Sequence, residues 1–339
     1  MSLRALIVGA GSMGRAWARI LTANDRVDLV GWSDRSIDIV DAACAETGID
    51  VPGRYDRFDS ALACRPDFVV DVTVPESHCE VTLQALEAGL PVLGEKPMAS
   101  TMAEARRMVE ASERAGKLYM VSQSRRYNAG LCALRRASRD RLGDLGILNA
   151  DFYLGPHFGG FRDEMGSPLL LDMAIHTFDA ARFLSGADPI SVYSEEFNPS
   201  WSWYRGNACA TAIFEMTGGL RFTYRGSWCA EGLMTSWESE WRLTGSKGTA
   251  TWNGTSAPRM EVVSGPDGFF SKTAPVEVEV DPVAEGIAGS LNEFLWALET
   301  GETPNGACQD NIKSLAMVFG AIESARQGRR ISIREILEG

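Results

Sequence analysis

The sequence has 339 residues and a mass of 36.9 kDa, more than twice the size of a common domain, which predicts about two domains. Its formal net charge of −12 and isoelectric point near 4.9 argue against nucleic acid or a membrane surface as partner. No apolar run approaches the roughly 20 residues that span a bilayer, and the N-terminus lacks the pattern of a signal peptide, so we expect a cytoplasmic protein.

Residues 3–123 alternate short apolar runs with amphipathic stretches, which is typical of βαβ units and a parallel sheet. Helices are expected over 13–23 and 101–116. In the second of these, Thr101 and Glu104 form a capping box at the start and Gly116 ends the helix. We therefore expect residues 1–123 to form a Rossmann domain with a doubly wound parallel sheet.

A glycine-rich loop lies between the first predicted strand and the first predicted helix: Gly9, Ala10, Gly11, Ser12, Met13 and Gly14. Such a loop lets the backbone approach a pyrophosphate at the helix N-terminus. Asp34 follows 20 residues later at the end of the second predicted strand, where a carboxylate can bind ribose hydroxyls. The alternative is a glycine turn with no ligand. Asp34 favours NAD, whereas Arg35 beside it can attract the 2′-phosphate of NADP.

Lys96 ends the predicted strand PVLGEKP, at the sheet edge where ligands bind in open α/β folds. Pro97 restricts its backbone, which would aim the side chain at a substrate hydroxyl whose developing negative charge it can stabilise. The alternative is a solvated lysine before a helix. Both readings stay open on position alone.

After residue 124 the pattern changes to an α+β type. Residues 167–186 predict a buried helix, and period-2 alternation over 190–280 predicts a large, mostly antiparallel open sheet, including a hairpin around Thr217-Gly218-Gly219. We assign 124–339 to a second domain that binds substrate. One face of its sheet is expected to be apolar and aromatic-rich and to be covered by self-association into a dimer or tetramer.

Three polar residues form a stripe on the predicted helix 167–186: Asp172, His176 and Asp179. A histidine oriented by a carboxylate can abstract a proton from an alcohol. The alternative is an internally satisfied Asp–His pair that ties the helix to the sheet.

Further residues are weaker candidates for contact with substrate. Arg126 and Tyr127 follow the last predicted strand of the first domain, and His157 lies in the glycine-rich loop GPHFGGFR, where an ordinary loop histidine is the simpler reading. The aromatic stretch 201–204 can stack on a sugar or belong to the core. Seven single cysteines and three histidines show no metal-binding spacing, so no metal is expected.

Six motifs occur in order along nearly the whole chain: GAGSMG at 9–14, VTVPESH at 72–78, GEKPMA at 94–99, SRRYNA at 124–129, GDLG at 143–146 and LLLDMAIHTFD at 169–179. In this combination the chain resembles the Gfo/Idh/MocA oxidoreductases. The resemblance implies a hydride transfer between a sugar or polyol and NAD or NADP. Val74 before Pro75, and Ala129 where the family often has proline, depart from the pattern and put the substrate's shape in doubt.

The resemblance also implies roles for single residues. Lys96, Asp172 and His176 match the catalytic positions, and the cofactor is implied to lie against one further set: Thr73, Val74, Pro75, His78, Glu95 and Gln123. Two rival functions in relatives are glycoside cleavage through transient oxidation by NAD, and dinucleotide sensing by a regulator without catalysis. The presence of all three catalytic matches argues against the second.

Overall fold

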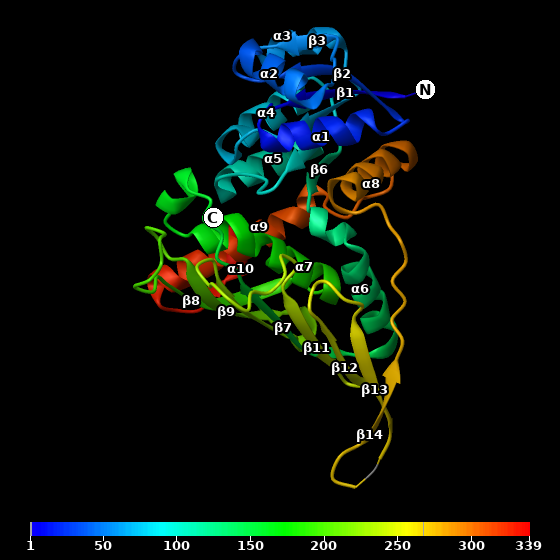
Figure 1. Ribbon diagram of the computed structural model, residues 1–339, viewed down its shortest axis with the longest axis vertical. Helices are drawn as coiled ribbons and strands as arrows, with labels where there is room; N and C mark the ends of the chain where they lie inside the picture. The colour runs from blue at the N-terminus through cyan, green and yellow to red at the C-terminus, as the bar shows by residue number, and fades with distance from the viewer. Residues whose placement is uncertain (1, 267) are drawn as a thin grey trace. The chain divides into compact units, whose positions relative to one another are not determined.

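The computed structural model describes residues 2–266 and 268–339, which fall into two compact units (Figure 1). One unit comprises the chain up to Ser124 together with Ala284–Ile312, and the other comprises Arg125–Val283 and Lys313–Gly339. Residues 284–312, which the sequence analysis placed in the second domain, thus belong to the first unit. The reason is packing: the ring of Phe294 lies 5.3 Å from that of Phe68, and the Asn292 side chain accepts a hydrogen bond from Arg26 at 2.9 Å.

The first unit contains a six-stranded parallel sheet in the order β3-β2-β1-β4-β5-β6. Its strands are β1 (Leu3–Val8), β2 (Val27–Ser33), β3 (Gly53–Tyr55), β4 (Phe68–Asp71), β5 (Val92–Glu95) and β6 (Tyr119–Ser122). Its helices are α1 (Ser12–Thr22), α2 (Ile37–Thr47), α3 (Phe58–Ala61), α4 (Pro75–Glu87), α5 (Met102–Ala115) and α8 (Gly286–Thr300). α1 contacts α2 and α8, while α4 contacts α5, as expected when right-handed crossovers place helices on both faces. The predicted doubly wound sheet is confirmed.

Local sequence signals explain where these elements begin and end. The Thr101 hydroxyl accepts a hydrogen bond from the backbone N–H of Glu104 at 3.2 Å, and Gly116 ends α5 in the left-handed conformation with φ of 58°. β1 and β4 are buried in the middle of the sheet, so their apolar runs do not alternate.

The second unit is built on a nine-stranded sheet in the order β14-β13-β12-β11-β7-β10-β9-β8-β15, in which only the β10–β7 pair is parallel among the described strands. The strands are β7 (Leu145–Tyr153), β8 (Pro189–Phe197), β9 (Cys209–Met216), β10 (Arg221–Ser227), β11 (Glu240–Gly245), β12 (Gly248–Trp252), β13 (Arg259–Gly265), β14 (Lys272–Val276) and β15 (Ile331–Ser332). Its helices are α6 (Ala129–Arg141), α7 (Ile175–Ser185) and α10 (Ile333–Glu338), and α9 (Cys308–Gln327) runs from the first unit into the second. The predicted α+β architecture is confirmed.

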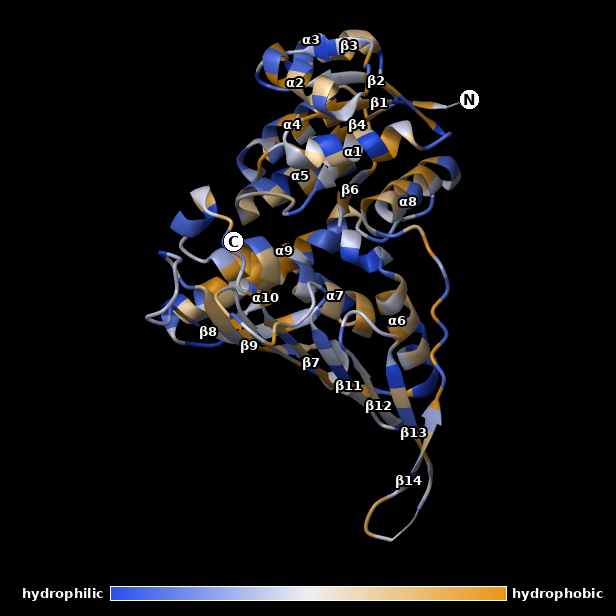
Figure 2. Cartoon of the chain, in the orientation of Figure 1, coloured by the Kyte–Doolittle hydropathy of each residue, from blue (hydrophilic) through white to orange (hydrophobic). Residues whose placement is uncertain are grey.

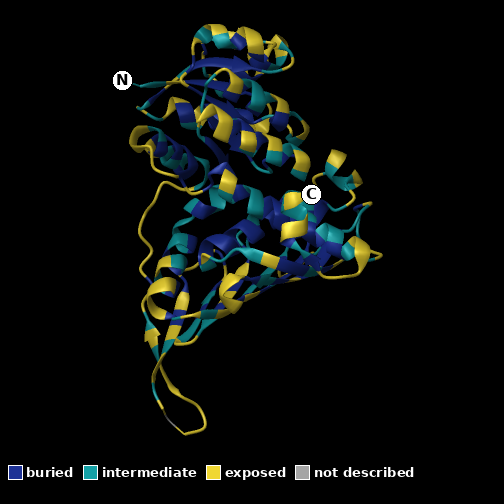
Figure 3. Cartoon of the chain, turned by 180° about the vertical axis from the view of Figure 1, so that it is seen from behind, coloured by how far each residue is buried: buried dark blue, intermediate teal, exposed yellow. Residues whose placement is uncertain are grey.

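One face of this sheet is apolar and covered by the chain's own helices, of which α7 is almost wholly buried (Figure 3). The Phe178 ring on α7 packs edge-on against Phe214 at 4.9 Å and Tyr224 at 5.2 Å. Within the chain, α6 contacts β12 and α7 contacts β7, so helices of the same chain pack on the apolar face. Self-association into a dimer or tetramer stays a prediction.

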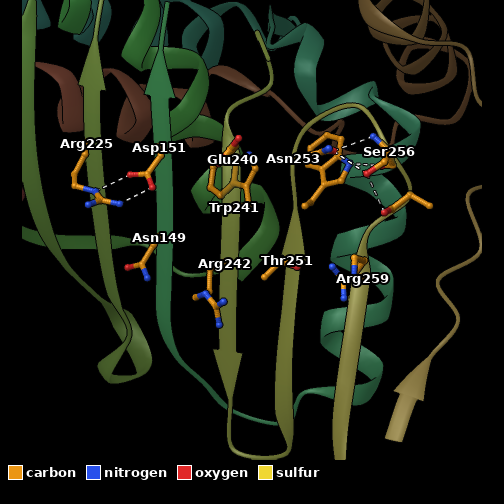
Figure 4. Close-up of a pocket in the computed structure, with 12 residues that line it drawn as sticks. Asn149, Asp151, Arg225, Glu240, Trp241, Arg242, Thr251, Asn253, Ser256 and Arg259 are labelled. Carbon is orange, nitrogen blue, oxygen red and sulfur yellow. Dashed lines mark hydrogen bonds and ion pairs between the residues drawn. The ribbon is translucent and has the colours of Figure 1, made fainter. Parts of the chain in front are cut away.

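Exposed positions on the opposite face include Arg225, Glu240 and Arg242. Figure 2 shows hydrophilic residues along the strands of this sheet, among them β11 and β12. Figure 4 shows a pocket on it, where Arg225 on β10 forms two hydrogen bonds to Asp151 on β7, beside Glu240, Arg242 and Arg259. The face thus carries charges of both signs in neighbouring strands.

The predicted helix over 167–186 is divided in the structure. Residues Leu169–Ala174 form a π-helix, and α7 follows at once from Ile175 to Ser185. A π-helix is wider than an α-helix and frequently occurs at functional sites.

Candidate active site

The glycine loop packs tightly at Gly9 and Gly14 and leaves open space at Gly11. A Cβ atom on Gly14 would lie 2.1 Å from the carbonyl oxygen of Gly9, and one on Gly9, which has φ of 108°, would lie 2.6 Å from that of Val72. Around Gly11, by contrast, no described heavy atom lies within 4 Å of the Cβ position. Gly11 is also the N-cap of α1 and offers no side chain to the free N–H groups of the first turn. The loop therefore fits a pyrophosphate.

Asp34 follows β2 and is held by the loop itself. Its Oδ2 atom accepts a hydrogen bond from the backbone N–H of Ala10 at 2.7 Å, and Oδ1 accepts one from the backbone N–H of Arg35 at 2.7 Å. The carboxylate is thereby fixed next to the glycine loop, as a ribose-binding group must be. Ser12, Met13 and Arg35 lie at the same edge, and all three residues are exposed.

Glu95 is a buried carboxyl directly before Lys96. Its Oε1 atom accepts a hydrogen bond from the Trp17 indole at 2.8 Å, and Oε2 accepts one from the backbone N–H of Lys96 at 3.2 Å. Burial raises the pKa of Glu95, while the bond from Trp17 and the charge of Lys96 act in the opposite direction. Both oxygens are engaged within the chain, so Glu95 fixes the backbone from which the Lys96 side chain projects.

His78 is a buried histidine of α4. Only 2% of its surface is exposed, and its Nδ1 atom lies 3.1 Å from Oδ2 of the fully buried Asp71. Asp71 also accepts hydrogen bonds from Thr73 Oγ1 at 2.7 Å and Thr82 Oγ1 at 3.3 Å. The contact of His78 with the cofactor stays a prediction, and the structure shows its side chain bound to Asp71. Thr73 and exposed Val74 lie directly before α4, which begins at Pro75.

The Asp71–His78 pair makes the stability of the first unit depend on pH. Burial alone would lower the pKa of His78, but the charge of Asp71 and its hydrogen bond outweigh this and raise it above 6.5. The folded state therefore binds a proton that the unfolded state releases above pH 6.5, so this contribution is complete below that pH and is lost as pH rises through the folded pKa. We expect wild-type stability in urea to fall more steeply above pH 6.5 than that of Asp71→Asn/His78→Asn. Parallel pH curves for the two proteins would contradict the pairing.

Gln123 follows β6 and is 1% exposed, yet neither its amide nitrogen nor its amide oxygen has a hydrogen-bond partner among the described residues. A buried amide without partners costs free energy unless a ligand supplies them. This fits the position next to the cofactor that the family resemblance implies.

In the second unit, Asp172 lies in the π-helix and His176 is the second residue of α7. Both are half-buried, although their neighbours Met173, Ala174 and Ile175 are buried. Asp172 Oδ2 accepts a hydrogen bond from Arg162 Nε at 2.7 Å. Of the three residues in the predicted polar stripe, Asp172 and His176 are thus half-buried and Asp179 is buried.

Asp179, the third residue of the predicted stripe, is 1% exposed and forms an ion pair with Arg126. The Nε and Nη2 atoms of Arg126 each donate to one Asp179 oxygen at 2.7 Å, and Ser314 Oγ donates to Oδ1 at 2.7 Å. Arg126 is itself 5% exposed and its ion pair is internal to the second unit, while its contact with substrate stays a prediction. Its neighbour Tyr127 is half-buried.

His157 is exposed and belongs to an aromatic surface. Its ring stacks on Trp203 with 3.8 Å between centroids, and its Nε2 atom lies 3.1 Å from Glu231 Oε1. The Tyr204 hydroxyl donates to the carbonyl oxygen of Pro156 at 3.0 Å, which ties the stretch 201–204 to the loop of His157. Trp201 is 72% exposed and the Tyr204 ring is buried.

The structure describes residues 2–266 and 268–339. No helix in these ranges has the length and apolar character to cross a membrane. Within the same ranges, no three or more His, Cys, Asp or Glu side chains gather as metal ligands would.

A sheet in this strand order, with a glycine loop after β1 and an acidic residue after β2, defines a dinucleotide-binding Rossmann fold. Residues 3–123 match the family model described as an oxidoreductase family with an NAD-binding Rossmann fold, and residues 133–251 match that of the GFO/IDH/MocA C-terminal domain. The chain belongs to the Gfo/Idh/MocA family of oxidoreductases.

Similar proteins span the full length of the chain. D-Apiose dehydrogenase of Paraburkholderia graminis is 27% identical over 97% of this chain and 89% of its own. Inositol 2-dehydrogenase of Rhizobium meliloti is 23% identical over 98% of this chain and 100% of its own. An oxidoreductase from Agrobacterium radiobacter, solved with NAD+, L-tartaric acid and magnesium, superposes with a TM-score of 0.87 at 22% identity over 99% and 100% of the two chains.

Sequence reasoning missed three side chains that the structure ties to these groups. Asp71, Trp17 and Arg162 bind His78, Glu95 and Asp172, respectively. Asp71 ends a buried strand run, which is a usable signal, whereas nothing in the sequence spacing relates Trp17 to Glu95 or Arg162 to Asp172.

Proposed function

We propose that this oxidoreductase interconverts a secondary alcohol and a ketone on a sugar or polyol, with NAD as its cofactor. The first unit binds the cofactor and the second binds the substrate. The observation that carries the proposal is that one chain holds both a dinucleotide loop bound by Asp34 and the half-buried residues Asp172 and His176, which are four positions apart. The names of the relatives, which include a D-apiose and an inositol dehydrogenase, support a sugar or polyol as substrate.

Three side chains are proposed to carry the chemistry. His176 takes the proton from the substrate hydroxyl, Asp172 orients the imidazole, and the Lys96 ammonium donates a hydrogen bond to the reacting oxygen. When bound, the nicotinamide supplies the site that accepts or donates the hydride. In the reductive direction His176 returns the proton to the same oxygen.

The experiment that tests this function follows reduced-cofactor absorbance over a panel of inositols, aldoses, ketoses, aldonates and glycosides, with NAD and NADP in parallel. Formation of NADH with at least one member is expected. Release of the leaving group from a glycoside without net NADH would replace the proposal with glycoside cleavage. Cofactor binding without any turnover of the panel would count against a sugar or polyol substrate.

The preference for NAD is proposed to depend on Asp34. Asp34→Ser should weaken NAD binding about 10- to 100-fold, because a charged hydrogen bond to the ribose is lost, and should leave NADP binding unchanged or improved. Arg35→Ala is the matched variant and should weaken only NADP. Calorimetric dissociation constants for both cofactors check this, and an equal loss of both cofactors in Asp34→Ser would contradict it.

We also propose that the polar face of the nine-stranded sheet joins copies of this chain into a dimer or tetramer. Charges of both signs on adjacent strands, such as Asp151 on β7 and Arg242 on β11 (Figure 4), can pair with the same face of a second copy about a twofold axis. Sedimentation at micromolar concentration should show an oligomer that high salt weakens. A monomer under these conditions would contradict the proposal.

A further inference from the structure

Arg162 lies beside the proposed catalytic carboxylate but has no assigned role. It belongs to a short 3-10 turn, Gly160–Glu164, and its Nε atom donates to Asp172 Oδ2 at 2.7 Å. About a third of its side chain is exposed. A cation is therefore held in contact with the group that orients the proposed base.

The guanidinium is held by more than this ion pair. Its central carbon lies 5.0 Å from the centroid of the Phe158 ring and 4.8 Å from that of Phe161. Gly159 and Gly160 between these rings both have φ of 69°, a conformation that side chains disfavour, and this turn brings both rings to the same guanidinium. Cation–π contacts of this kind fix the orientation of the planar group.

The loop that carries Arg162 packs against other aromatic residues of the second unit. The Phe158 ring packs at 6.1 Å from Trp228 and 6.5 Å from Trp237, and these two tryptophans pack on each other at 6.3 Å. Arg162 is thus placed before a ligand arrives, which lowers the entropy that binding costs.

Most hydrogen-bonding capacity of Arg162 is unused. A guanidinium has five N–H donors, and in the described part of the chain only the Nε–H of Arg162 has an acceptor. The two Nη groups form the forked end that matches a carboxylate with two parallel hydrogen bonds. The surroundings add negative charge, because Asp163 belongs to the same turn and Glu164 pairs with Arg205 at 3.0 Å. These carboxylates disfavour a doubly charged phosphate more than a singly charged carboxylate.

We propose that the Nη groups of Arg162 bind a carboxylate of the substrate, so that the enzyme acts on a sugar acid, an aldonate or a uronate, in preference to the neutral sugar. This inference rests on the proposed function and narrows its substrate class. Because the same guanidinium contacts Asp172, the bound carboxylate lies close to the hydroxyl on which Asp172 and His176 act. The carboxylate itself undergoes no reaction.

The test compares ligands that differ only in this group: D-gluconate against D-glucitol, and D-glucuronate against D-glucose. Dissociation constants are measured by calorimetry with NAD present, and kcat/KM by NADH formation. Wild type should prefer one acid over its neutral partner at least about 10-fold. In Arg162→Met that ratio should fall about 10- to 100-fold, as expected for a lost charged hydrogen bond. Arg162→Lys should restore only part of it, since a lysine keeps the charge and loses the fork.

Arg205→Met is the matched control, because Arg205 is another arginine of the same unit. Its side chain is 78% exposed and pairs with Glu164. Its acid-to-neutral ratio should equal that of wild type. Equal losses for acid and neutral ligands in Arg162→Met would overturn the inference and leave Arg162 with a purely positioning role toward Asp172. So would failure of both acids to bind wild type at millimolar concentration, or tighter binding of a sugar phosphate than of either acid.

The two proposals fail in different ways. Oxidation of neutral sugars without preference for an acid leaves the proposed function standing and removes the inference about Arg162. Acid binding that depends on Arg162, without NADH from any ligand, supports the carboxylate site and counts against the oxidoreductase reaction on these sugars.

Discussion

Lys96→Met is expected to lower kcat by at least about 10³-fold while the dissociation constant for NAD changes less than about threefold. A preorganised donor to a developing oxyanion contributes about 10²–10³-fold by itself, and the ammonium adds a full positive charge to that interaction. The methionine side chain is similar in length to that of lysine. The backbone N–H of residue 96, which donates a hydrogen bond to Glu95 Oε2 at 3.2 Å, is kept. The variant therefore removes the charge and retains the local backbone. Single-turnover NADH formation and calorimetric NAD binding provide the two measurements.

Lys117→Met serves as the control, because Lys117 is an exposed lysine of the same unit, and its turnover should match that of wild type. Unchanged turnover in Lys96→Met would remove the lysine from the mechanism. Loss of NAD binding by more than about tenfold would instead mean that Lys96 mainly holds the cofactor.

Much of the fold could be predicted because local signals and tertiary packing agree. The buried strands of the first unit read as continuous apolar runs, and the start of α5 is fixed by a hydrogen bond between residues only three apart. The hairpin of β9 and β10 was predicted from alternation, and its register pairs Phe222 with Phe214 on the covered face. Such features depend on neighbours in sequence or on a simple period.

The candidate site was predictable only in part, since its supporting contacts join distant residues. Nothing in the spacing of Arg126 and Asp179, 53 positions apart, distinguishes a buried ion pair from two groups open to substrate. The π-helix at Leu169–Ala174 has the same apolar pattern as an α-helix, and only packing decides between them. Residues 284–312 read as the end of the second domain, because sequence order alone does not show that α8 packs on α1.

The buried ion pair of Arg126 with Asp179 leads to a prediction about the free energy of unfolding. Arg126→Met should destabilise the second unit by about 3–5 kcal/mol, because it leaves the carboxylate of Asp179 buried without its cation. Arg126→Met/Asp179→Asn should recover about 2 kcal/mol or more of that loss, since the uncompensated charge is gone and the Ser314 hydroxyl can still donate to the remaining oxygen. Urea unfolding followed by tryptophan fluorescence reports on this unit, which holds the six tryptophans between Trp201 and Trp252. A raised KM with unchanged stability would instead return Arg126 to the substrate site. Because the two outcomes appear in different measurements, a single variant decides whether the buried ion pair holds α7 in place or binds substrate.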